Sequence, residues 1–267
     1  MTESFPKNES DEIAFSPVKS ADRVLTLIEL LTTNRDGLTF TELQELTALP
    51  RSSLYGLLRT MSERHHLQFD PHSQGYRIGV RLWEAGQAFN SGVRIEQVAM
   101  PHLRHARDQL DETVQLAVLD GMENIYVAKV DASHALRLDS FVGARLPAYA
   151  TGIGKVLLSG LGKSKVDQLL AKTELIRFTD TTISDADSLH EALERIRQQG
   201  FAIDDGEYTL GVHCFAVAVR DVSGEVIAAI SASIPSPRLS DGIQTRAVNT
   251  LQEAAGQISA QLGYRAG

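Results

Sequence analysis

One short stretch, residues 51–59, carries polar side chains suited to binding DNA. Its apolar residues recur at i, i+3, i+4 and i+7, which predicts an amphipathic helix whose apolar face meets a core. These apolar residues are Leu54, Leu57, Leu58 and Met61. Arginine side chains bind guanine O6 and N7 in the major groove, and hydroxyl groups bind phosphates or base edges. The opposite helix face carries Arg51, Ser52, Ser53, Tyr55 and Arg59, and it is either a DNA-binding surface or an ordinary solvated face.

A second candidate site begins at Thr151-Gly-Ile-Gly-Lys155, which opens a predicted helix over 152–161. The free N–H groups at the start of a helix bind anions such as carboxylates. The segment is not the phosphate-binding loop of nucleotide hydrolases. That motif requires glycine at 149 and serine or threonine at 156, where this chain has Tyr149 and Val156. We therefore expect a small-anion site without nucleotide hydrolysis.

Further polar residues lie in predicted strands of the same half of the chain. Cys214 falls in an apolar run, and Ser231 and Ser233 lie two apart, so their side chains share one face of a strand. Asp204 and Glu207 lie just upstream of Cys214. Serine hydroxyls can donate to a carboxylate, and Asp204 can accept from ligand hydroxyls. A small cysteine and tolerated strand hydroxyls in an ordinary core would produce the same pattern.

An enzyme and a metal site are the competing hypotheses. His213 and Cys214 would be a base and a nucleophile, but adjacent strand residues point to opposite faces. His102 and His105 have the spacing of a helical metal-binding pair, yet no third ligand is evident. We therefore expect no catalytic residues, no metal and no cofactor.

Secondary-structure patterns place these residues in an α+β chain of two parts. Residues 1–17 are polar and acidic, which predicts a disordered tail. Residues 18–79 carry three helical patterns and then a hairpin with strand-like runs at 67–69 and 76–78, the order of a winged helix-turn-helix. Residues 80–94 predict a linker helix. Over 95–267, helices mixed with strands at 114–119, 125–130, 135–141, 212–219 and 225–233 predict an antiparallel sheet with flanking helices.

Composition sets limits on location and charge. The net charge is −8, but residues 18–80 carry seven basic and seven acidic side chains, so the predicted DNA-binding part is neutral.

The single cysteine excludes an intrachain disulfide. No signal peptide or membrane-length apolar run is present, so we expect a cytoplasmic protein without a membrane partner. A protein that binds or hydrolyses a small molecule without binding DNA remains the alternative.

After residue 17 the chain resembles the IclR family of bacterial transcription regulators over nearly its whole length. In the first part the resemblance is carried by Ser20-Ala-Asp-Arg-Val-Leu, Leu38-Thr-Phe-Thr-Glu-Leu, Pro50-Arg-Ser-Ser-Leu-Tyr-Gly-Leu-Leu-Arg-Thr-Met and Gly75-Tyr-Arg-Ile-Gly. In the second part it is carried by 145–158, Gly200-Phe-Ala-Ile-Asp-Asp-Gly-Glu-Tyr-Thr-Leu-Gly-Val-His-Cys and Ala228-Ala-Ile-Ser-Ala-Ser. The joint order and spacing of these motifs make the match specific.

The resemblance implies a DNA-binding head and a GAF-like domain that binds a small effector. DNA-contacting residues are then expected at Thr39, Arg51, Ser52, Ser53, Tyr55, Arg59 and Arg77. Effector-binding residues, carried over position by position, are Leu146, Gly152, Ile153, Asp204, Val212, Cys214, Ser231 and Ser233. The partners implied are a double-stranded DNA operator, a small organic acid and a second copy of the chain. Repression is the commoner behaviour in the family.

The effector is expected to be a small hydroxy- or keto-acid. The chain is most similar to the branch that includes the 2-keto-3-deoxygluconate repressors, through 151–158 and Ile125-Tyr-Val-Ala-Lys-Val-Asp. It departs from that pattern at Gly206, His213 and Ala218, where the branch usually has an acid, an arginine and a proline. Leu82, Trp83 and Phe89 of the linker helix are the expected dimer contacts, and the family often assembles further into tetramers.

Overall fold

The computed structural model describes residues 17–89, 95–134 and 140–265. The chain divides into two compact units, residues 1–91 and 92–267, and each is described by itself. The expected disordered tail lies almost wholly in residues 1–16, outside the described residues, as do residues 90–94 of the expected linker helix.

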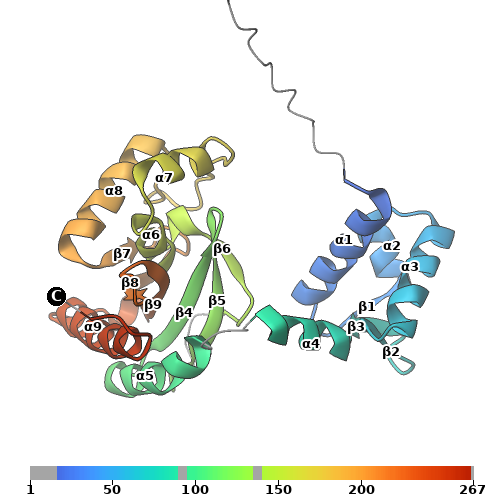
Figure 1. The fold of residues 1–267 in the computed structure, drawn as a ribbon, viewed down its shortest axis with the longest axis horizontal. Helices are drawn as coiled ribbons and strands as arrows, with labels where there is room; N and C mark the ends of the chain where they lie inside the picture. Colours follow the sequence, from blue (N-terminus) through green and yellow to red (C-terminus); the bar gives the residue numbers. More distant parts are fainter. Residues whose placement is uncertain (1–16, 90–94, 135–139, 266–267) are drawn as a thin grey trace, which may run out of the picture. The chain divides into compact units, whose positions relative to one another are not determined.

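Unit 1 is a helical domain with a small sheet (Figure 1). Its elements in chain order are α1 (Lys19–Thr33), β1 (Leu38–Thr39), α2 (Phe40–Thr47), α3 (Arg51–Glu63), β2 (Leu67–Asp70), β3 (Gly75–Ile78) and α4 (Val80–Phe89). The three strands form an antiparallel sheet in the order β1-β3-β2, in which β2 and β3 make the hairpin. This order of elements is the winged helix-turn-helix that the sequence predicts.

The helices of unit 1 pack around one apolar core. Leu54, Leu58 and Met61 of α3, whose spacing predicts a buried face, lie in it with Leu27 of α1 and Leu43 of α2. The other face of α3 is therefore turned outward. At the start of α2, Thr39 and Glu42 form a capping box, in which each side chain accepts the other residue's backbone N–H.

Unit 2 is built on a six-stranded antiparallel sheet with helices on both faces. The strand order is β6-β5-β4-β9-β8-β7, and the strands are β4 (Thr113–Asp120), β5 (Glu123–Val130), β6 (Arg145–Pro147), β7 (Ala202–Asp205), β8 (Val212–Arg220) and β9 (Val226–Pro235). The helices are α5 (Ile95–Leu110), α6 (Gly152–Ser159), α7 (Lys163–Leu170), α8 (Ala186–Gln199) and α9 (Ile243–Gln261). This arrangement agrees with the predicted α+β domain with an antiparallel sheet and flanking helices.

Two hydrophobic cores lie on opposite faces of this sheet. One core joins α5 and α9 to the sheet through residues such as Leu103, Ile230 and Leu251. The other joins α6 and α8 to the opposite face through residues such as Ile153 and Leu193. Because strand residues alternate between faces, Ile230, Ala232 and Ile234 meet α5 and α9, while the intervening Ser231 and Ser233 face the α6 side.

The predicted helices of unit 2 form, but the strands differ in part from expectation. Three short strands, β1 of unit 1 and β6 and β7 of unit 2, were not predicted, because runs of two to four residues carry too little periodicity. The strand expected near 135–141 falls mostly on residues 135–139, outside the described residues, and Ser140 and Phe141 are not in a strand. Of the described helices, none is long and apolar enough to cross a membrane.

Candidate functional site

The outward face of α3 presents most of the residues expected to contact DNA. Arg51, Ser52, Tyr55 and Arg59 are exposed, and Tyr55 has 57% of its surface accessible. Ser53 is less exposed than these four residues, since it is half-buried and its hydroxyl accepts a hydrogen bond of 3.1 Å from Arg23 Nη1 of α1. The helix therefore offers two arginines and several hydroxyl groups to one surface, while its leucines hold it on the core.

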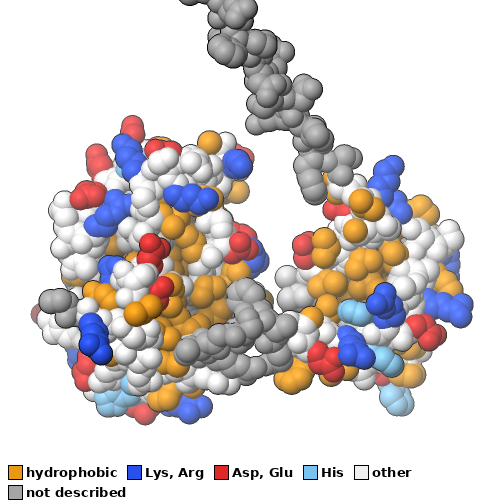
Figure 2. Space-filling model, in the orientation of Figure 1, with side chains coloured by type: hydrophobic (Ala, Val, Ile, Leu, Met, Phe, Trp, Pro, Cys, Tyr) orange, Lys and Arg blue, Asp and Glu red, His pale blue; other side chains and the backbone are white. Residues whose placement is uncertain are grey.

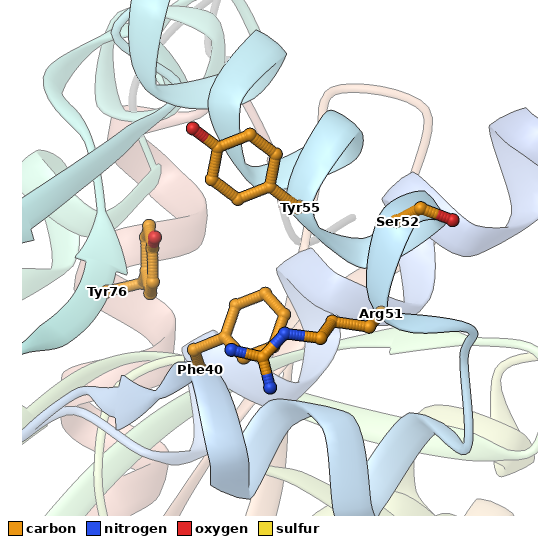
Figure 3. Close-up of a pocket in the computed structure, with 5 residues that line it drawn as sticks. All are labelled: Phe40, Arg51, Ser52, Tyr55 and Tyr76. Atoms are coloured by element: carbon orange, nitrogen blue, oxygen red, sulfur yellow. The ribbon is translucent and has the colours of Figure 1, made fainter.

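A pocket of about 700 Å³ opens beside the first turn of α3 (Figure 3). It is lined by Phe40, Arg51, Ser52, Tyr55 and Tyr76, which come from α2, α3 and β3. The guanidinium carbon of Arg51 lies 5.2 Å from the ring centroid of Phe40, within the range of a cation–π contact. The lining has one positive charge and no acidic side chain. Phe40 and Tyr76 were not expected in a site, because an aromatic residue in an apolar pattern looks like core.

The other two residues expected at the DNA surface already have partners within unit 1. The Thr39 hydroxyl accepts the N–H of Glu42 at 3.3 Å and donates to its carboxylate at 2.8 Å. Arg77 Nε donates to the backbone carbonyl of Asp36 at 2.9 Å, which ties the hairpin to the turn after α1. Arg77 remains exposed, so its other guanidinium nitrogens face the surface.

In unit 2, strand pairing aligns three of the expected effector-binding residues. Asp204 of β7 is the direct partner of Cys214 of β8, and Cys214 is the direct partner of Ser233 of β9. Direct partners on antiparallel strands have side chains on the same face. These three residues, here called the polar row, therefore lie side by side on the α6 side of the sheet.

Hydrogen bonds extend the polar row onto β4. The Ser233 hydroxyl donates to Oε1 of Gln115 at 3.0 Å and lies 3.3 Å from the Cys214 sulfur. The Ser231 hydroxyl reaches the same Gln115 oxygen at 3.4 Å. Gln115, Ser231 and Ser233 are buried, so these groups are held in one arrangement away from solvent.

The start of α6 packs directly against this row. A Cβ on Gly152 would lie 3.4 Å from Asp204 Cβ and from the Cys214 carbonyl oxygen, so the helix backbone itself adjoins the row. Thr151 caps α6 by accepting the Gly154 N–H at 3.2 Å. Contrary to the simple expectation of free N–H groups, the Gly154 donor at this helix start thus has an acceptor within the protein.

Asp204 has a proton affinity that is unusual for an aspartate. Burial raises the pKa of Asp204 to about 7, against the opposing effects of the Glu207 N–H, which donates at 2.7 Å, and of nearby Lys155. Burial also raises the pKa of the Cys214 thiol, with the Asp204 charge adding to the effect. Near neutral pH, Asp204 is therefore partly protonated and Cys214 is a neutral thiol, so the polar row can both donate and accept hydrogen bonds.

Five more residues surround the polar row. Lys155 donates to the Ile203 carbonyl at 2.8 Å and is ion-paired with Glu207, and the Thr151 hydroxyl donates to Asn124 Oδ1 at 2.7 Å. Buried Nδ2 of Asn124 and Oε2 of Glu207 have no hydrogen-bond partner in the structure. The polar row, Ser231 and these five residues form what we call the polar cluster; the five are Gln115, Asn124, Thr151, Lys155 and Glu207. The sequence indicates the last three, at the expected helix start and beside Asp204, but not Gln115 and Asn124, which lie on the distant strands β4 and β5.

The remaining expected effector residues lie at the edges of the polar cluster. Ile153 is fully buried in the core under α6. Leu146 of β6 pairs directly with Asn124, which places it beside the cluster. Val212 begins β8, two residues before Cys214, and pairs with Pro235. The structure thus brings Gly152, Asp204 and Cys214 together at the start of α6, with Ser231 and Ser233 on the adjoining strand and Leu146 and Val212 further out.

The histidines of the enzyme and metal hypotheses are engaged in hydrogen bonds elsewhere in unit 2. His213 bonds to Asp205 at 2.7 Å and to Ser236 at 2.9 Å, on the face of β8 opposite Cys214. His102 and His105 are hydrogen-bonded to glutamines, Gln261 and Gln109. Over the described part of the chain, no group of three or more potential ligand side chains could hold a metal ion.

Family comparisons match both units. Residues 20–71 match the IclR helix-turn-helix domain, and residues 87–260 match the C-terminal domain of the bacterial transcriptional regulator IclR. These matches confirm the family resemblance that the sequence motifs indicate.

Individual relatives cover nearly the whole chain. The transcriptional regulator XynR of Escherichia coli is 33% identical over 93% of this chain and 99% of its own length. The regulator KdgR of the same species is 34% identical over 92% of this chain and 94% of its own. A solved IclR homologue from Microbacterium hydrocarbonoxydans, in complex with 4-hydroxybenzoate, has a TM-score of 0.80 and 28% identity, covering 91% of this chain and 98% of that one.

Proposed function

Because the chain belongs to the IclR family of bacterial transcriptional regulators, we propose that it is a repressor whose DNA binding is controlled by a small organic acid. Unit 1 binds double-stranded operator DNA, and unit 2 binds the effector against the polar cluster. The observation that carries the proposal is the polar row, Asp204, Cys214 and Ser233, set against the start of α6. Such a set of largely buried donors and acceptors is typical of a small-molecule site.

The DNA-binding surface of the proposal is the outward face of α3 with the hairpin. Arg59 and Ser52 project from the helix that enters the major groove, and Arg77 lies on the hairpin beside it. One head with a neutral total charge binds DNA weakly, so two heads on two half-sites are needed for useful affinity. The protein therefore acts as a dimer, with tetramers as a further assembly.

Exposed apolar residues of unit 1 support the dimer. Val80 and Trp83 of α4 are 60% and 63% exposed, and Leu25 of α1 is 58% exposed. Figure 2 shows hydrophobic side chains gathered over α1. Surfaces of this kind are commonly buried in protein–protein contacts. Of the other two expected dimer contacts, Leu82 is half-buried and Phe89 has a side chain outside the described residues.

The proposed effector is a small hydroxy- or keto-acid. Ser231 and Ser233 supply hydroxyl groups to its carboxylate, and Asp204 bonds to its hydroxyl or keto oxygen according to its protonation. The 34% identity to KdgR agrees with the similarity to the 2-keto-3-deoxygluconate repressors. Binding then shifts the population of dimers whose heads fit the operator.

An aromatic acid is the second candidate effector. The homologue from Microbacterium hydrocarbonoxydans is in complex with 4-hydroxybenzoate, and in this chain the ring of Tyr126 is buried in the core on the α6 side of the sheet. A catalytic role is not part of the proposal, and we place the protein in the cytoplasm, where operator DNA is found.

Fluorescence anisotropy tests the proposal. Full-length protein is titrated onto the intergenic DNA beside its own gene, at two salt concentrations, with and without a panel of hydroxy-, keto- and aromatic acids. We expect sequence-specific, salt-sensitive binding that one class of acid weakens. The triple variant R51A/S53A/R59A should lose DNA binding and still bind the acid in calorimetry, while R195A, which removes an exposed arginine of α8, should behave as wild type.

Absence of specific DNA binding under all conditions would overturn the proposal. It would favour a protein that only binds, or hydrolyses, a small molecule, for which C214A would be the first variant to assay. Specific binding that no acid alters would retain the regulator and reject the effector class.

A further inference from the structure

The aromatic pocket of unit 1, lined by Phe40, Arg51, Ser52, Tyr55 and Tyr76, constrains one of the two arginines of α3. In Figure 3 the Arg51 side chain runs from α3 toward α2, and its guanidinium group lies at the ring of Phe40. The ring of Tyr55 lies on the same side from the next turn of α3, and Tyr76 faces the pocket from β3. Arg51 is thus turned toward the preceding helix.

This position decides which part of DNA Arg51 can contact. In a helix-turn-helix, the second helix enters the major groove and the first helix crosses the sugar-phosphate backbone. An arginine in cation–π contact with Phe40, the first residue of α2, lies where the backbone passes. This contact uses the face of the ring and leaves guanidinium N–H groups for a bidentate bond to phosphate oxygens.

We propose that the aromatic pocket binds one phosphate and its deoxyribose on the DNA backbone, with Arg51 as the phosphate ligand, and that Arg59 is the arginine that selects bases. The inference rests on the proposed function, since it assigns roles within the same DNA surface. It gives different roles to Arg51 and Arg59, which the sequence alone does not distinguish.

The lining of the pocket supports this occupant. Arg51 provides a positive charge, no acidic residue lines the pocket, and Ser52 adds a hydroxyl group. Burial raises the pKa of Tyr76, so its phenol stays protonated and can donate to a phosphate oxygen. The rings of Phe40 and Tyr55 offer apolar surface for a sugar ring. A base unstacked into the pocket is the rival occupant, and it would make binding depend on sequence at one position.

Salt dependence and sequence preference separate these roles. The probe is a fluorescein-labelled duplex selected by the full-length protein from a random library, compared with a scrambled duplex of equal length. Anisotropy gives Kd for both duplexes at five salt concentrations. The variants are R51A, R51K, F40L and R59A, with R195A in unit 2 as the matched control, and thermal melts verify that each is folded.

We expect R51A to reduce the slope of log Kd against log salt by about one per bound head. R51A should weaken both duplexes by similar factors, leaving their ratio within about twofold. R51K should keep the slope because it keeps the charge, and F40L should weaken both duplexes because the guanidinium group loses its support. R59A should lower the ratio by about tenfold or more.

Three results would overturn the inference. An unchanged slope with R51A, or a loss of preference at one base pair, would make Arg51 a base-contacting residue or place the rival base in the pocket. Wild-type affinity in F40L would show that the stack has no role. If the wild-type protein itself prefers no duplex, the proposed function fails first, and the inference fails with it.

Discussion

Lys155 near the start of α6 and Glu207 in the turn after β7 form an ion pair inside unit 2, where only 4% and 10% of their side chains are exposed. The lysine also donates to the Ile203 carbonyl at 2.8 Å. The pair thereby joins the start of α6 to the end of β7, the two segments that hold Gly152 against Asp204. Its integrity sets the geometry of the polar row.

Removal of the lysine charge should destabilise the protein strongly. We expect K155M to lower the free energy of unfolding by about 3–5 kcal/mol, because it leaves Glu207 buried without its counter-charge. Urea denaturation followed by circular dichroism measures the change. K163M, which removes an exposed lysine of α7, serves as the control, and K155M/E207L should recover much of the loss. A K155M transition at the wild-type midpoint would mean that the pair contributes little.

Asp204 should make stability depend on pH between about 4 and 7. Its pKa is about 7 in the folded protein against 3.8 for an ordinary aspartate, so the folded state binds the proton more tightly. As pH rises through this range, the unfolded state loses its proton first and the folded protein is destabilised, by about 4 kcal/mol in all. Above pH 7 no further loss comes from this group.

The variant D204N isolates this effect. It keeps an oxygen acceptor for the N–H group of Glu207 but does not titrate. Urea denaturation at pH 5 and pH 8 gives the free energy of unfolding of both proteins. The wild-type value should fall relative to the D204N value at the higher pH. D241N, which changes an exposed aspartate, should differ from wild type by the same free energy of unfolding at both pH values. A wild-type-to-D204N difference that is constant with pH would refute the assignment.

Effector binding should depend on the serines of β9. Removing the Ser233 hydroxyl deletes the donor to Gln115 and the partner of Cys214. The test ligand is the acid that gives the largest calorimetric heat with wild type. We expect S233A to raise its Kd by about tenfold, the equivalent of one good hydrogen bond. S164A, an exposed serine of α7, should bind as wild type. Unchanged affinity in S233A would place the ligand elsewhere in unit 2.

Two helical glycines should respond oppositely to alanine. A Cβ on Gly154 would overlap the backbone of Ala148, so G154A must push α6 away from the preceding turn and should destabilise the protein by at least about 2 kcal/mol. Nothing lies within 4 Å of a Cβ on Gly256 in α9, so G256A should stabilise by about 0.5–1 kcal/mol. Thermal melts of both variants test the pair. Equal effects of the two substitutions would contradict the close packing of Gly154.

The sequence predicted the long elements of the fold because their periodicity is strong. Leu54, Leu58 and Met61 define the buried face of α3, and Gly200, in the left-handed region at φ 82°, ends α8. The short strands β6 and β7 escaped prediction. Asp204 therefore appeared as a residue near Cys214 in sequence order, without a strand to make it the direct neighbour of that residue.

The amino-acid sequence by itself determined the family, the helix-turn-helix and the polar residue types available to each site. Only the tertiary structure decided which of those residues meet. Cross-strand register aligned Asp204, Cys214 and Ser233, and packing of α6 placed Lys155 and Thr151 beside them. Stacking on Phe40 turned Arg51 toward α2. Local periodicity is encoded by neighbouring residues, whereas these contacts join segments that are distant in sequence and exist only once the chain has folded.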